Sequence, residues 1–315
     1  MKKWIAFLWK NAEPLLVGGL VFASLIGYCG AYFSVFDHFA HFRVQYCVLA
    51  VVLLFWLIYL KHWLYAIIML CVALFNGWLV KDWVWVQQQP ASTKSDFRVF
   101  HANVLFKNED YERVIAQIRE ENPDFYSLNE TLPASIQYFQ QHLPQYPYTY
   151  HVHAKNQTKV LFGSKQPFKI DSAASFKVSG LIVADMTLAG RKTKVILCHA
   201  YNPIRFSDFD IRNQQLAYVQ QFVRKSILPV VMVGDLNITP WSVFYQQFEQ
   251  KSQLHNTRKG FGWNATWPFW MLPMRIPIDH CLISRELEVI NFRTGHANGS
   301  DHLPLVIDLK YKKPL

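Results

Sequence analysis

Three apolar stretches without a charged side chain lie near the start of this 315-residue chain. They run from Leu15 to Phe36, from Val44 to Leu60 and from Trp63 to Val80. As helices, all three are long enough to cross a hydrocarbon core of about 30 Å. The alternative is a secretory signal peptide followed by buried core helices, but the apolar region of a signal peptide spans only about 7 to 15 residues. The sequence therefore predicts a membrane domain, residues 1–86, with three transmembrane helices.

Basic residues flank these stretches unevenly. Arg43, between the first and second stretches, is offset by Asp37. The basic residues of the N-terminus and of the turn between the second and third stretches are Lys2, Lys3, Lys10 and Lys61. Because flanking Lys and Arg favour the cytoplasmic side, we expect a multi-pass protein of the inner (plasma) membrane with a cytoplasmic N-terminus. Everything after the third helix then lies on the periplasmic, extracytoplasmic side.

The remainder of the chain is polar and basic. Residues 87–96, with three consecutive Gln, have the composition of a short linker. From Ala91 onward there are 26 Lys and Arg against 19 Asp and Glu, a net charge of +7. Such an excess favours a polyanionic or phosphate-bearing partner, or an anionic lipid surface. An ordinary solvated surface with a modest excess of positive charge remains the alternative.

Residues 97–315 alternate between β-rich runs and helical patterns. Several runs, such as Leu228–Val233, are continuously apolar, as expected for strands covered on both faces. Helical patterns occupy residues 110–121, 133–143, 209–225 and 242–251. About ten strands and four helices in a single domain fit two sheets packed face to face with helices outside. The predicted fold class is α+β, a four-layer α/β/β/α sandwich preceded by the three transmembrane helices.

Acidic, amide and imidazole side chains recur where the predicted strands end. The clearest case is the string GSDHLPL, in which Asp301 and His302 lead directly into an apolar strand. An Asp beside a His at a strand mouth suggests a metal ligand next to a general base. The other members of the set are Asn103 in HANV, Glu130 in SLNET, His199 in LCHAYNP, Asp235 and Asn237 in VGDLNITP, and Asp279 in PIDHCLIS.

This ordered set resembles the endonuclease/exonuclease/phosphatase (DNase I-like) superfamily over about Phe97 to Leu309. The joint occurrence of GDLN and SDH, in that order, makes the resemblance specific. Members of the superfamily include DNase I-like nucleases, apurinic endonucleases, neutral sphingomyelinases and inositol polyphosphate 5-phosphatases. Asn129 stands where Gln usually precedes the glutamate, and Leu236 replaces the usual Phe of GDFN. Neither departure removes a ligand or a base.

The resemblance implies a bound divalent cation, Mg²⁺ or alternatively Mn²⁺, on hard oxygen ligands. Glu130 would be the principal metal ligand, with Asn103 and Asp301 contributing. His302 would activate water or grip the phosphate, and Asp279 would orient it. The remaining assignments are Asp235 and Asn237 for positioning the nucleophile and the scissile phosphate, His199 for a hydrogen bond to a phosphate oxygen, and Asn202 and Arg275 for further phosphate contacts.

Ordinary structural roles remain alternatives for several of these residues. The polar residues of GDLN could cap the helix that follows them. His199 could be a structural histidine at a strand end, and Asn103 a turn residue. His280 points away from the face of Asp279 and is expected to pack or to contact a partner. The aromatic segment 260–275 could stack on bases, enter a bilayer interface or simply pack as a loop.

The sequence therefore predicts a membrane-anchored, metal-dependent phosphoester hydrolase, of the nuclease or phosphodiesterase type. The basic balance favours a phosphodiester in nucleic acid as the substrate. A phospholipid or sphingomyelin-type headgroup is the alternative, since lipids are neighbours of any anchored enzyme. A non-catalytic module that binds phosphorylated ligands or a protein partner is the alternative of another class. The complete set of acid, amide and imidazole positions argues against that module, because a binder needs no general base beside a metal site.

Overall fold

The computed structural model describes residues 12–87, 94–175 and 178–313. The chain forms two compact units. The helical unit runs through Asp82 and also includes Thr239–Gln246, and the sandwich unit comprises Trp83–Ile238 and Gln247–Leu315. The N-terminal lysines that set the predicted orientation, and most of the predicted linker, lie outside the described residues.

Three helical segments of the helical unit are long and apolar enough to cross a membrane, as predicted. The first joins α2 (Ala12–Ile26) to the 3₁₀ helix η1 (Gly27–Ala31). The second contains α3 (Ser34–Phe39), η2 (Ala40–Phe42) and α4 (Arg43–Tyr59), and the third is α5 (Trp63–Val84). The second segment begins ten residues earlier than the predicted Val44, because the stretch around Asp37 and Arg43 is helical rather than a loop.

Buried polar groups inside the helical unit have protein partners. The Arg43 guanidinium donates to the backbone carbonyl of Ser24, and Asn76 donates to the Ser24 hydroxyl (3.0 Å). The Asp37 carboxylate accepts a hydrogen bond from the Ser242 hydroxyl (2.6 Å). Charged side chains in an apolar surrounding persist only with such partners, so these bonds explain how charge is tolerated among the apolar helices.

The sandwich unit is built on two six-stranded mixed sheets. The first has the order β11-β12-β1-β2-β4-β3 and the second the order β5-β6-β7-β8-β10-β9. The strands of the first sheet are β1 (Phe97–Asn103), β2 (Phe125–Thr131), β3 (Tyr148–His153), β4 (Lys159–Ser164), β11 (Leu287–Thr294) and β12 (Leu305–Tyr311). Those of the second are β5 (Phe168–Ile170), β6 (Leu181–Leu188), β7 (Arg191–Cys198), β8 (Val230–Asp235), β9 (His255–Asn256) and β10 (Asp279–Ile283).

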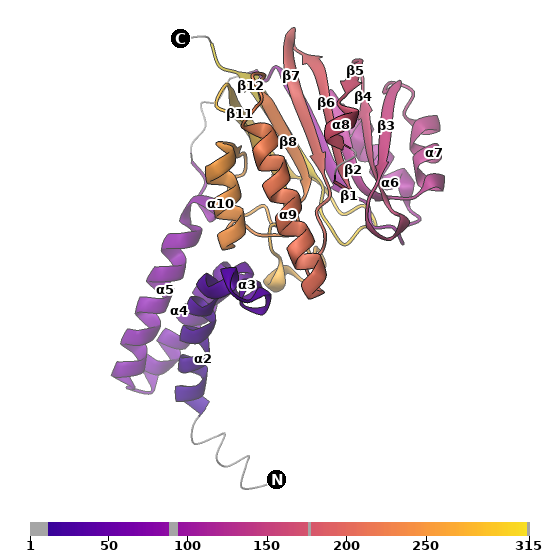
Figure 1. Cartoon of the computed structure of the whole chain (residues 1–315). Helices are drawn as coiled ribbons and strands as arrows, with labels where there is room; N and C mark the ends of the chain where they lie inside the picture. The colour runs from indigo at the N-terminus through magenta and orange to yellow at the C-terminus, as the bar shows by residue number, and fades with distance from the viewer. Residues whose placement is uncertain (1–11, 88–93, 176–177, 314–315) are drawn as a thin grey trace. The chain divides into compact units, whose positions relative to one another are not determined.

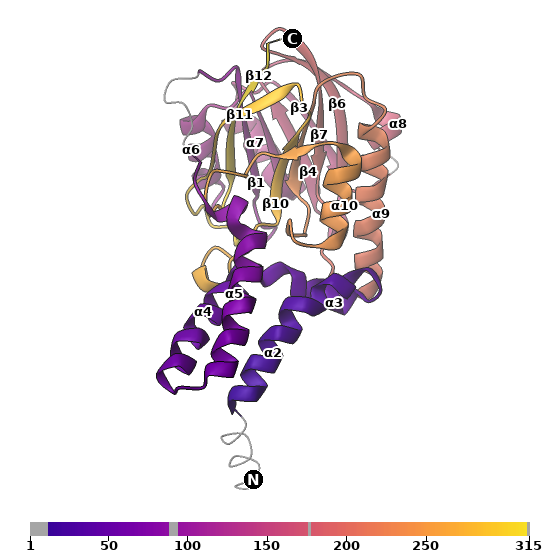
Figure 2. The ribbon, with the colours of Figure 1, turned by 90° about the vertical axis from the view of Figure 1, so that its left-hand side faces the viewer.

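The inner faces of the two sheets form one hydrophobic core, in which Val99, Phe162, Val195 and Val231 are completely buried. Burying one such side chain stabilises the fold by about 1.5 to 3 kcal/mol. Helices α6 (Tyr111–Glu121) and α7 (Pro133–His142) cover the outside of the first sheet, and α9 (Phe206–Val223) and α10 (Val243–Ser252) lie outside the second (Figure 2). The predicted four-layer sandwich is confirmed.

Most predicted elements are present within a few residues of their expected ends. The elements that the sequence did not predict are very short: β5, β9, α8 (Ser172–Ser175) and the 3₁₀ helices η3 (Lys155–Gln157) and η4 (Leu272–Met274). Segments of two to five residues show no measurable hydrophobic period. Helix α6 ends as predicted before Pro123, with Asn122 in the left-handed region (φ 47°).

Strand directions bring the candidate residues to one edge of the sandwich. Strand β1 is parallel to β2, and β7 is parallel to β8. Strand β12 is antiparallel to β1, and β10 is antiparallel to β8. The carboxyl ends of β1, β2, β7 and β8 and the amino ends of β10 and β12 therefore lie at the same edge. We call it the polar edge (Figure 1).

Candidate active site

The polar edge collects every residue that the sequence assigned to a metal or to catalysis. Asn103 is the last residue of β1, Glu130 lies near the end of β2, and Asp235 is the last residue of β8. The remaining members lie just beyond β7, at the start of β10 and just before β12: His199, Asp279, Asp301 and His302. Segments that are up to about two hundred residues apart in the chain thus supply one site.

Glu130 has an unusual backbone conformation. Its φ is 61°, in the left-handed region, and the pairing of β2 with β4 shifts register between Leu128 and Thr131. Such a bulge turns a side chain away from the regular alternation, at a strain of about 1 to 2 kcal/mol for a residue other than glycine. Asn103 holds the redirected carboxylate, because its Nδ2 donates to Glu130 Oε1 (3.0 Å). The Asn103 Oδ1 accepts from the backbone N–H of Leu105 (3.0 Å), which fixes the amide.

A buried imidazole–carboxylate–imidazole group lies behind the polar edge. The His302 Nδ1 lies 2.8 Å from Asp279 Oδ2, and the His101 Nε2 lies 3.1 Å from Asp279 Oδ1. Asp279 thus contacts the His302 ring at Nδ1, and its role in orienting that ring stays a prediction. The second histidine, His101, was missed. Its position two residues before Asn103 on β1 puts both on one face of the strand, which is the signal that could have identified it.

The loop after β8 is held by its own polar side chains. The Asp235 Oδ1 accepts from the backbone N–H of Asn237 (2.9 Å), and its Oδ2 accepts from Asn103 Nδ2 (3.1 Å). The Asn237 Nδ2 donates to the carbonyl of Ala200 (2.9 Å), and its φ of 50° is left-handed. These bonds join the loop to β1 and to the segment after β7. The capping alternative would instead require these side chains to bond to the start of α10.

The glycine before Asp235 allows this arrangement. A Cβ added to Gly234 would lie 1.7 Å from the carbonyl oxygen of Cys198 on β7. No side chain fits in that space, so Gly234 lets β7 and β8 approach closely. The close approach places Asp235 next to His199.

The functional atoms point toward a common space. The His199 Nε2 lies 3.9 Å from both Glu130 Oε1 and Asp235 Oδ2. The His302 Nε2 lies 3.9 Å from both Asp235 Oδ2 and Asp301 Oδ1. Two imidazoles therefore alternate with three carboxylates in one series of neighbouring groups.

Burial and neighbouring charge shift the pKa values of these groups. Burial, followed by the charge of Asp279, raises the pKa of Asp235 to about 8. Burial alone would lower the pKa of His302, but Asp279, Asp235 and Asp301 together raise it to about 10. Burial opposes ionisation of Asp279, yet His302 and His101 hold its pKa well below the usual range. Burial lowers the pKa of His199. The charge of the nearby His302 lowers the pKa of Asp235 but does not offset the effect of burial.

The donor set fits a divalent cation. Glu130, Asp235 and Asp301 supply hard carboxylate oxygens, the ligand type that Mg²⁺ prefers. Oxygen and nitrogen atoms of Asp235, Asp279 and His302 lie within 4.8 Å of one another. A bound cation would favour the ionised form of Asp235, whose pKa burial raises. Family members are typically dependent on divalent metals; which metal, and through which of these oxygens, stays a prediction for this chain.

A cleft of about 380 Å³ opens beside this centre. Glu130 and His199 form part of its wall, together with Asn202 and the exposed Arg205. Asn202 thus lines the cleft, and its contact with phosphate stays a prediction. Arg275 instead donates from Nε to the carbonyl of Phe269 (2.7 Å) within its own loop, and its contact with phosphate stays a prediction.

Asp301 is anchored by the aromatic segment that precedes β10. The Trp267 Nε1 donates to Asp301 Oδ2 (2.9 Å), and the Phe269 N–H donates to the Asp301 carbonyl (2.9 Å). Sequence inspection identified this segment but not the anchoring role of Trp267. His280, as predicted, faces away from the site: its Nε2 lies 2.7 Å from the carbonyl of Ile238.

Exposed apolar side chains gather around the polar edge. Ile204, in the cleft wall, is 81% exposed, and Leu272, in the segment anchored to Asp301, is 62% exposed. We call this set the apolar rim: Phe106, Ile204, Phe206, Trp270, Met271, Leu272 and Met274. Large exposed apolar side chains clustered at a site mark a surface for protein, ligand or membrane contact.

A family model for the endonuclease/exonuclease/phosphatase family matches residues 100–302, more than half of the chain. The chain belongs to this family. The match starts in β1 and ends at His302, so it contains the whole constellation described above. Family members hydrolyse phosphoester bonds, so this protein is expected to be an enzyme of that general type.

Solved structures of family members share the fold. One is zebrafish (D. rerio) TDP2 complexed with a single-strand DNA product: 15% identity, 68% of this chain and 98% of that chain covered, TM-score 0.55. The human Nocturnin catalytic domain with bound sulfate is 19% identical, with 70% of this chain and 97% of that chain covered and a TM-score of 0.55. A mannosyl-6-phosphatase from Bacteroides thetaiotaomicron is 16% identical, with 68% and 100% covered and a TM-score of 0.52. Among curated proteins, none matches the sequence significantly.

Proposed function

We propose that this protein is a membrane-anchored, divalent-metal-dependent phosphodiesterase whose active site is the polar edge. The observation that carries the proposal is the convergence of Glu130, Asp235 and Asp301 with the Nε2 atoms of His199 and His302. A site that only bound phosphate would need cations alone. Three carboxylates next to two imidazoles are suited instead to holding a metal and moving a proton.

The residues of the site have distinct roles in the proposed reaction. A divalent cation held by Glu130 and Asp301, with Asn103 supporting, would polarise a phosphoryl oxygen and stabilise charge on the leaving oxygen. Asn237 and Asp235 orient the attacking water, and Asp235 accepts its proton. The new P–O bond forms as the bond from phosphorus to the leaving oxygen breaks, and that oxygen takes up a proton from solvent.

The two histidines act on the phosphate. The His302 Nε2 and the His199 Nε2 face the space between the carboxylates, where they donate hydrogen bonds to phosphoryl oxygens. Asp279 holds the His302 ring through Nδ1 and keeps its Nε2 directed at the substrate. Asn202 and Arg205 line the adjoining cleft and contact the remaining phosphate oxygens or the headgroup.

The apolar rim favours a phosphodiester carried by a lipid. Ile204 lines the cleft, Leu272 and Met274 lie in the segment that anchors Asp301, and all three are exposed. Such unstacked, flexible apolar side chains suit acyl chains better than nucleobases. Three candidate membrane helices in the same chain keep the sandwich unit near a bilayer. The proposed substrate class is therefore a phospholipid or sphingomyelin-type headgroup, on the extracytoplasmic face of the membrane.

Nucleic acid, favoured by the basic balance of the sequence, is the second candidate. Lys107 and Arg205 are exposed near the cleft, and Phe106 and Trp270 could stack on bases. A relative that carries a single-strand DNA product, TDP2, supports this candidate at the level of fold.

A substrate panel separates the candidates. Purified full-length protein in nanodiscs with Mg²⁺ would be incubated with phospholipid and sphingomyelin vesicles, plasmid DNA, single-stranded oligonucleotides and bis(4-nitrophenyl) phosphate. We expect turnover of the soluble diester and faster turnover of a lipid. Hydrolysis of nucleic acid alone would favour the second candidate, and no hydrolysis of any substrate, unchanged by Glu130→Gln, would favour a non-catalytic binding module.

A further inference from the structure

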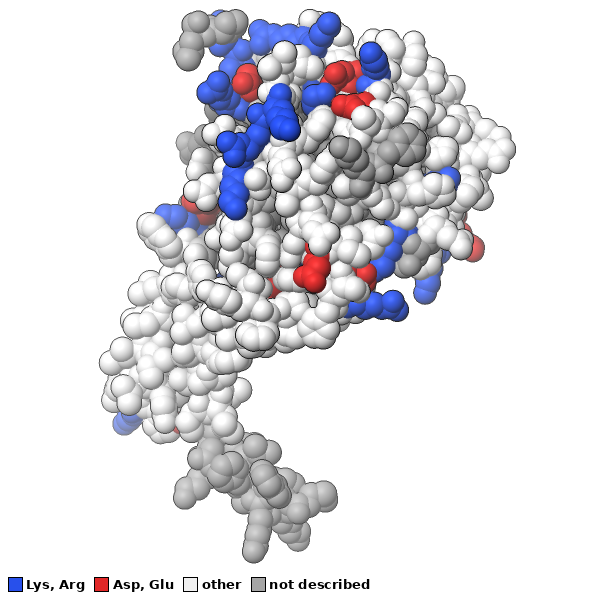
Figure 3. All heavy atoms as spheres, in the orientation of Figure 1, with Lys and Arg blue, Asp and Glu red and all other residues white. Residues whose placement is uncertain are grey.

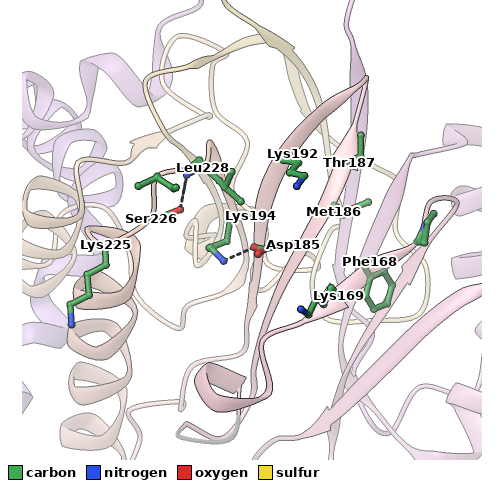
Figure 4. A pocket seen from close by; sticks show the side chains of 12 residues that line it. Phe168, Lys169, Asp185, Met186, Thr187, Lys192, Lys194, Lys225, Ser226 and Leu228 are labelled. Carbon is green, nitrogen blue, oxygen red and sulfur yellow. Dashed lines mark hydrogen bonds and ion pairs between the residues drawn. The ribbon is translucent and has the colours of Figure 1, made fainter.

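The edge of the sandwich opposite the polar edge is rich in Lys and Arg. Figure 3 shows basic side chains gathered over the end where β7 starts and β12 ends. An open groove of about 760 Å³ lies there, lined by residues of β5, β6, β7 and the segment after α9 (Figure 4). Four of its lining residues are lysines, namely Lys169, Lys192, Lys194 and Lys225, against one carboxylate, Asp185. We call it the basic groove.

The fold explains why this surface is open. Ala184, Met186 and Val195 point into the core between the sheets, so Asp185, Lys192 and Lys194 must point outward. Helix α9 covers the outer face of this sheet but ends at Val223. The outer face beyond the end of α9 is left uncovered, and the lysines stand there.

Three of the four lysines have no counter-charge. Lys194 pairs with Asp185. Within the described parts of the chain, no carboxylate lies within ion-pair distance of Lys169, Lys192 or Lys225. All three side chains are exposed. Three unopposed ammonium groups around one groove attract anions and are not needed to balance the protein's own charge.

The lysines are too widely spaced for a single phosphate. Strand β5 pairs with β6 and β6 with β7, so Lys169 and Lys192 stand on strands about 10 Å apart. Lys225 adds a charge on the α9 side of the groove, with its side chain directed along that helix (Figure 4). Arg191 and Lys312 continue the series of charges past the groove, where Arg191 donates to the Lys312 carbonyl (3.2 Å). A row of separate point charges matches an extended chain of phosphates.

Apolar side chains complete the wall of the groove. Phe168 lines the groove, but its ring packs inward on Phe162 with centroids 4.2 Å apart, so it supports the wall from inside the unit. Leu228 and the fully exposed Ile227 form the opposite wall. A positively charged groove that follows the phosphate backbone is a feature by which proteins hold single-stranded nucleic acid without reading its sequence.

We propose that the basic groove binds the phosphate backbone of single-stranded nucleic acid, at a site separate from the active site. Strand β7 runs from the groove to His199, so the two sites are about 20 Å apart. The inference does not require the proposed hydrolase activity. The groove opens at the far end of the unit from the apolar rim, which favours a soluble polyanion over the bilayer that the rim would contact.

The test is binding by fluorescence anisotropy to a labelled oligodeoxythymidylate of about 20 nucleotides, with chelator present to prevent cleavage. The groove variant replaces Lys169, Lys192 and Lys225 by Ala. We expect about tenfold weaker binding and a fall of about 2 in the slope of log affinity against log salt, because three contacts to a single strand are lost.

Two matched variants isolate the groove. The charge control replaces Arg113, Arg119 and Lys251 by Ala, which removes the same charge from exposed positions on α6 and α10, outside the groove. It should bind nearly as the unchanged protein does. The Lys→Arg triple at the three groove positions keeps the charge and should restore binding and the salt slope.

Two results would overturn the proposal. One is equal binding by the groove variant and the charge control. The other is a groove variant that loses binding to phosphatidylglycerol vesicles and not to the oligonucleotide, which would identify the groove as a lipid-binding surface. Hydrolysis of bis(4-nitrophenyl) phosphate should be the same in all variants, so a failed hydrolase proposal appears in that assay and not in the binding assay.

Discussion

The two edges of the sandwich unit are formed by opposite ends of the same strands, but they differ in charge and burial. At the polar edge, β7 leads into His199 and β8 ends in Asp235. Both residues are buried, and Asp235 accepts a hydrogen bond from Asn103 of β1. At the opposite edge, β7 begins with Arg191 and Lys192, which are exposed. Buried titratable groups have shifted pKa values and a fixed geometry, as catalysis requires, whereas exposed lysines suit adaptable binding.

The largest expected effect contrasts an aspartate at each edge. Asp235→Asn removes the proposed proton acceptor, and kcat for the soluble diester should fall by about a thousandfold. Asp185→Asn at the basic groove should leave kcat within about twofold, because that carboxylate pairs only with Lys194. Steady-state kinetics on both variants measure the difference. Equal losses in the two variants would contradict the assignment of catalysis to the polar edge.

The next effect tests positioning within the polar edge. Asp279→Asn should lower kcat by about a hundredfold with little change in KM, because His302 loses the carboxylate that orients its ring. His101→Gln, which leaves that pair intact, should lower kcat by about tenfold or less. A larger loss of kcat for His101→Gln than for Asp279→Asn would contradict the proposal that Asp279 matters more than His101 for positioning His302.

Substitutions of two glycines compare how closely the backbone is packed at the two edges. Gly234→Ala should lower the free energy of unfolding by about 2 kcal/mol, because the new Cβ meets the Cys198 carbonyl. Gly190→Ala, in the turn between β6 and β7, meets no atom within 4 Å and should cost about 1 kcal/mol through its positive φ alone. Urea unfolding of the full chain in detergent measures both. Equal losses of unfolding free energy in the two variants would mean that β7 and β8 can move apart at no cost in stability.

The smallest effect concerns the apolar rim. Ile204→Ser combined with Leu272→Ser should lower kcat/KM on lipid vesicles by about tenfold, because apolar contact with the bilayer is lost, and should leave the soluble diester unaffected. Ile227→Ser at the basic groove removes an equally exposed side chain and serves as the control. Equal rates on vesicles for the rim variant and the control would remove the support for a lipid substrate.

Much of this account could be predicted from the sequence, because its signals are local. Uncharged runs marked the three long helices, and polar residues after apolar runs marked the members of the site. His101 was missed because its spacing from Asn103 shows a shared strand face but not the distant Asp279 that it contacts. The basic groove was missed because Lys169, Lys192 and Lys225 are far apart in the chain, and only the pairing of β5 with β6 and β7 brings them together.

The most direct test of the central claim is hydrolysis of bis(4-nitrophenyl) phosphate as a function of Mg²⁺ concentration, in the unchanged protein and in Glu130→Gln. The account predicts saturable activation by Mg²⁺ that chelator abolishes, and a Glu130→Gln variant with both a higher half-activating Mg²⁺ concentration and a much lower maximal rate. Hydrolysis that is insensitive to chelator, or a Glu130→Gln variant with unchanged metal dependence and rate, would contradict it.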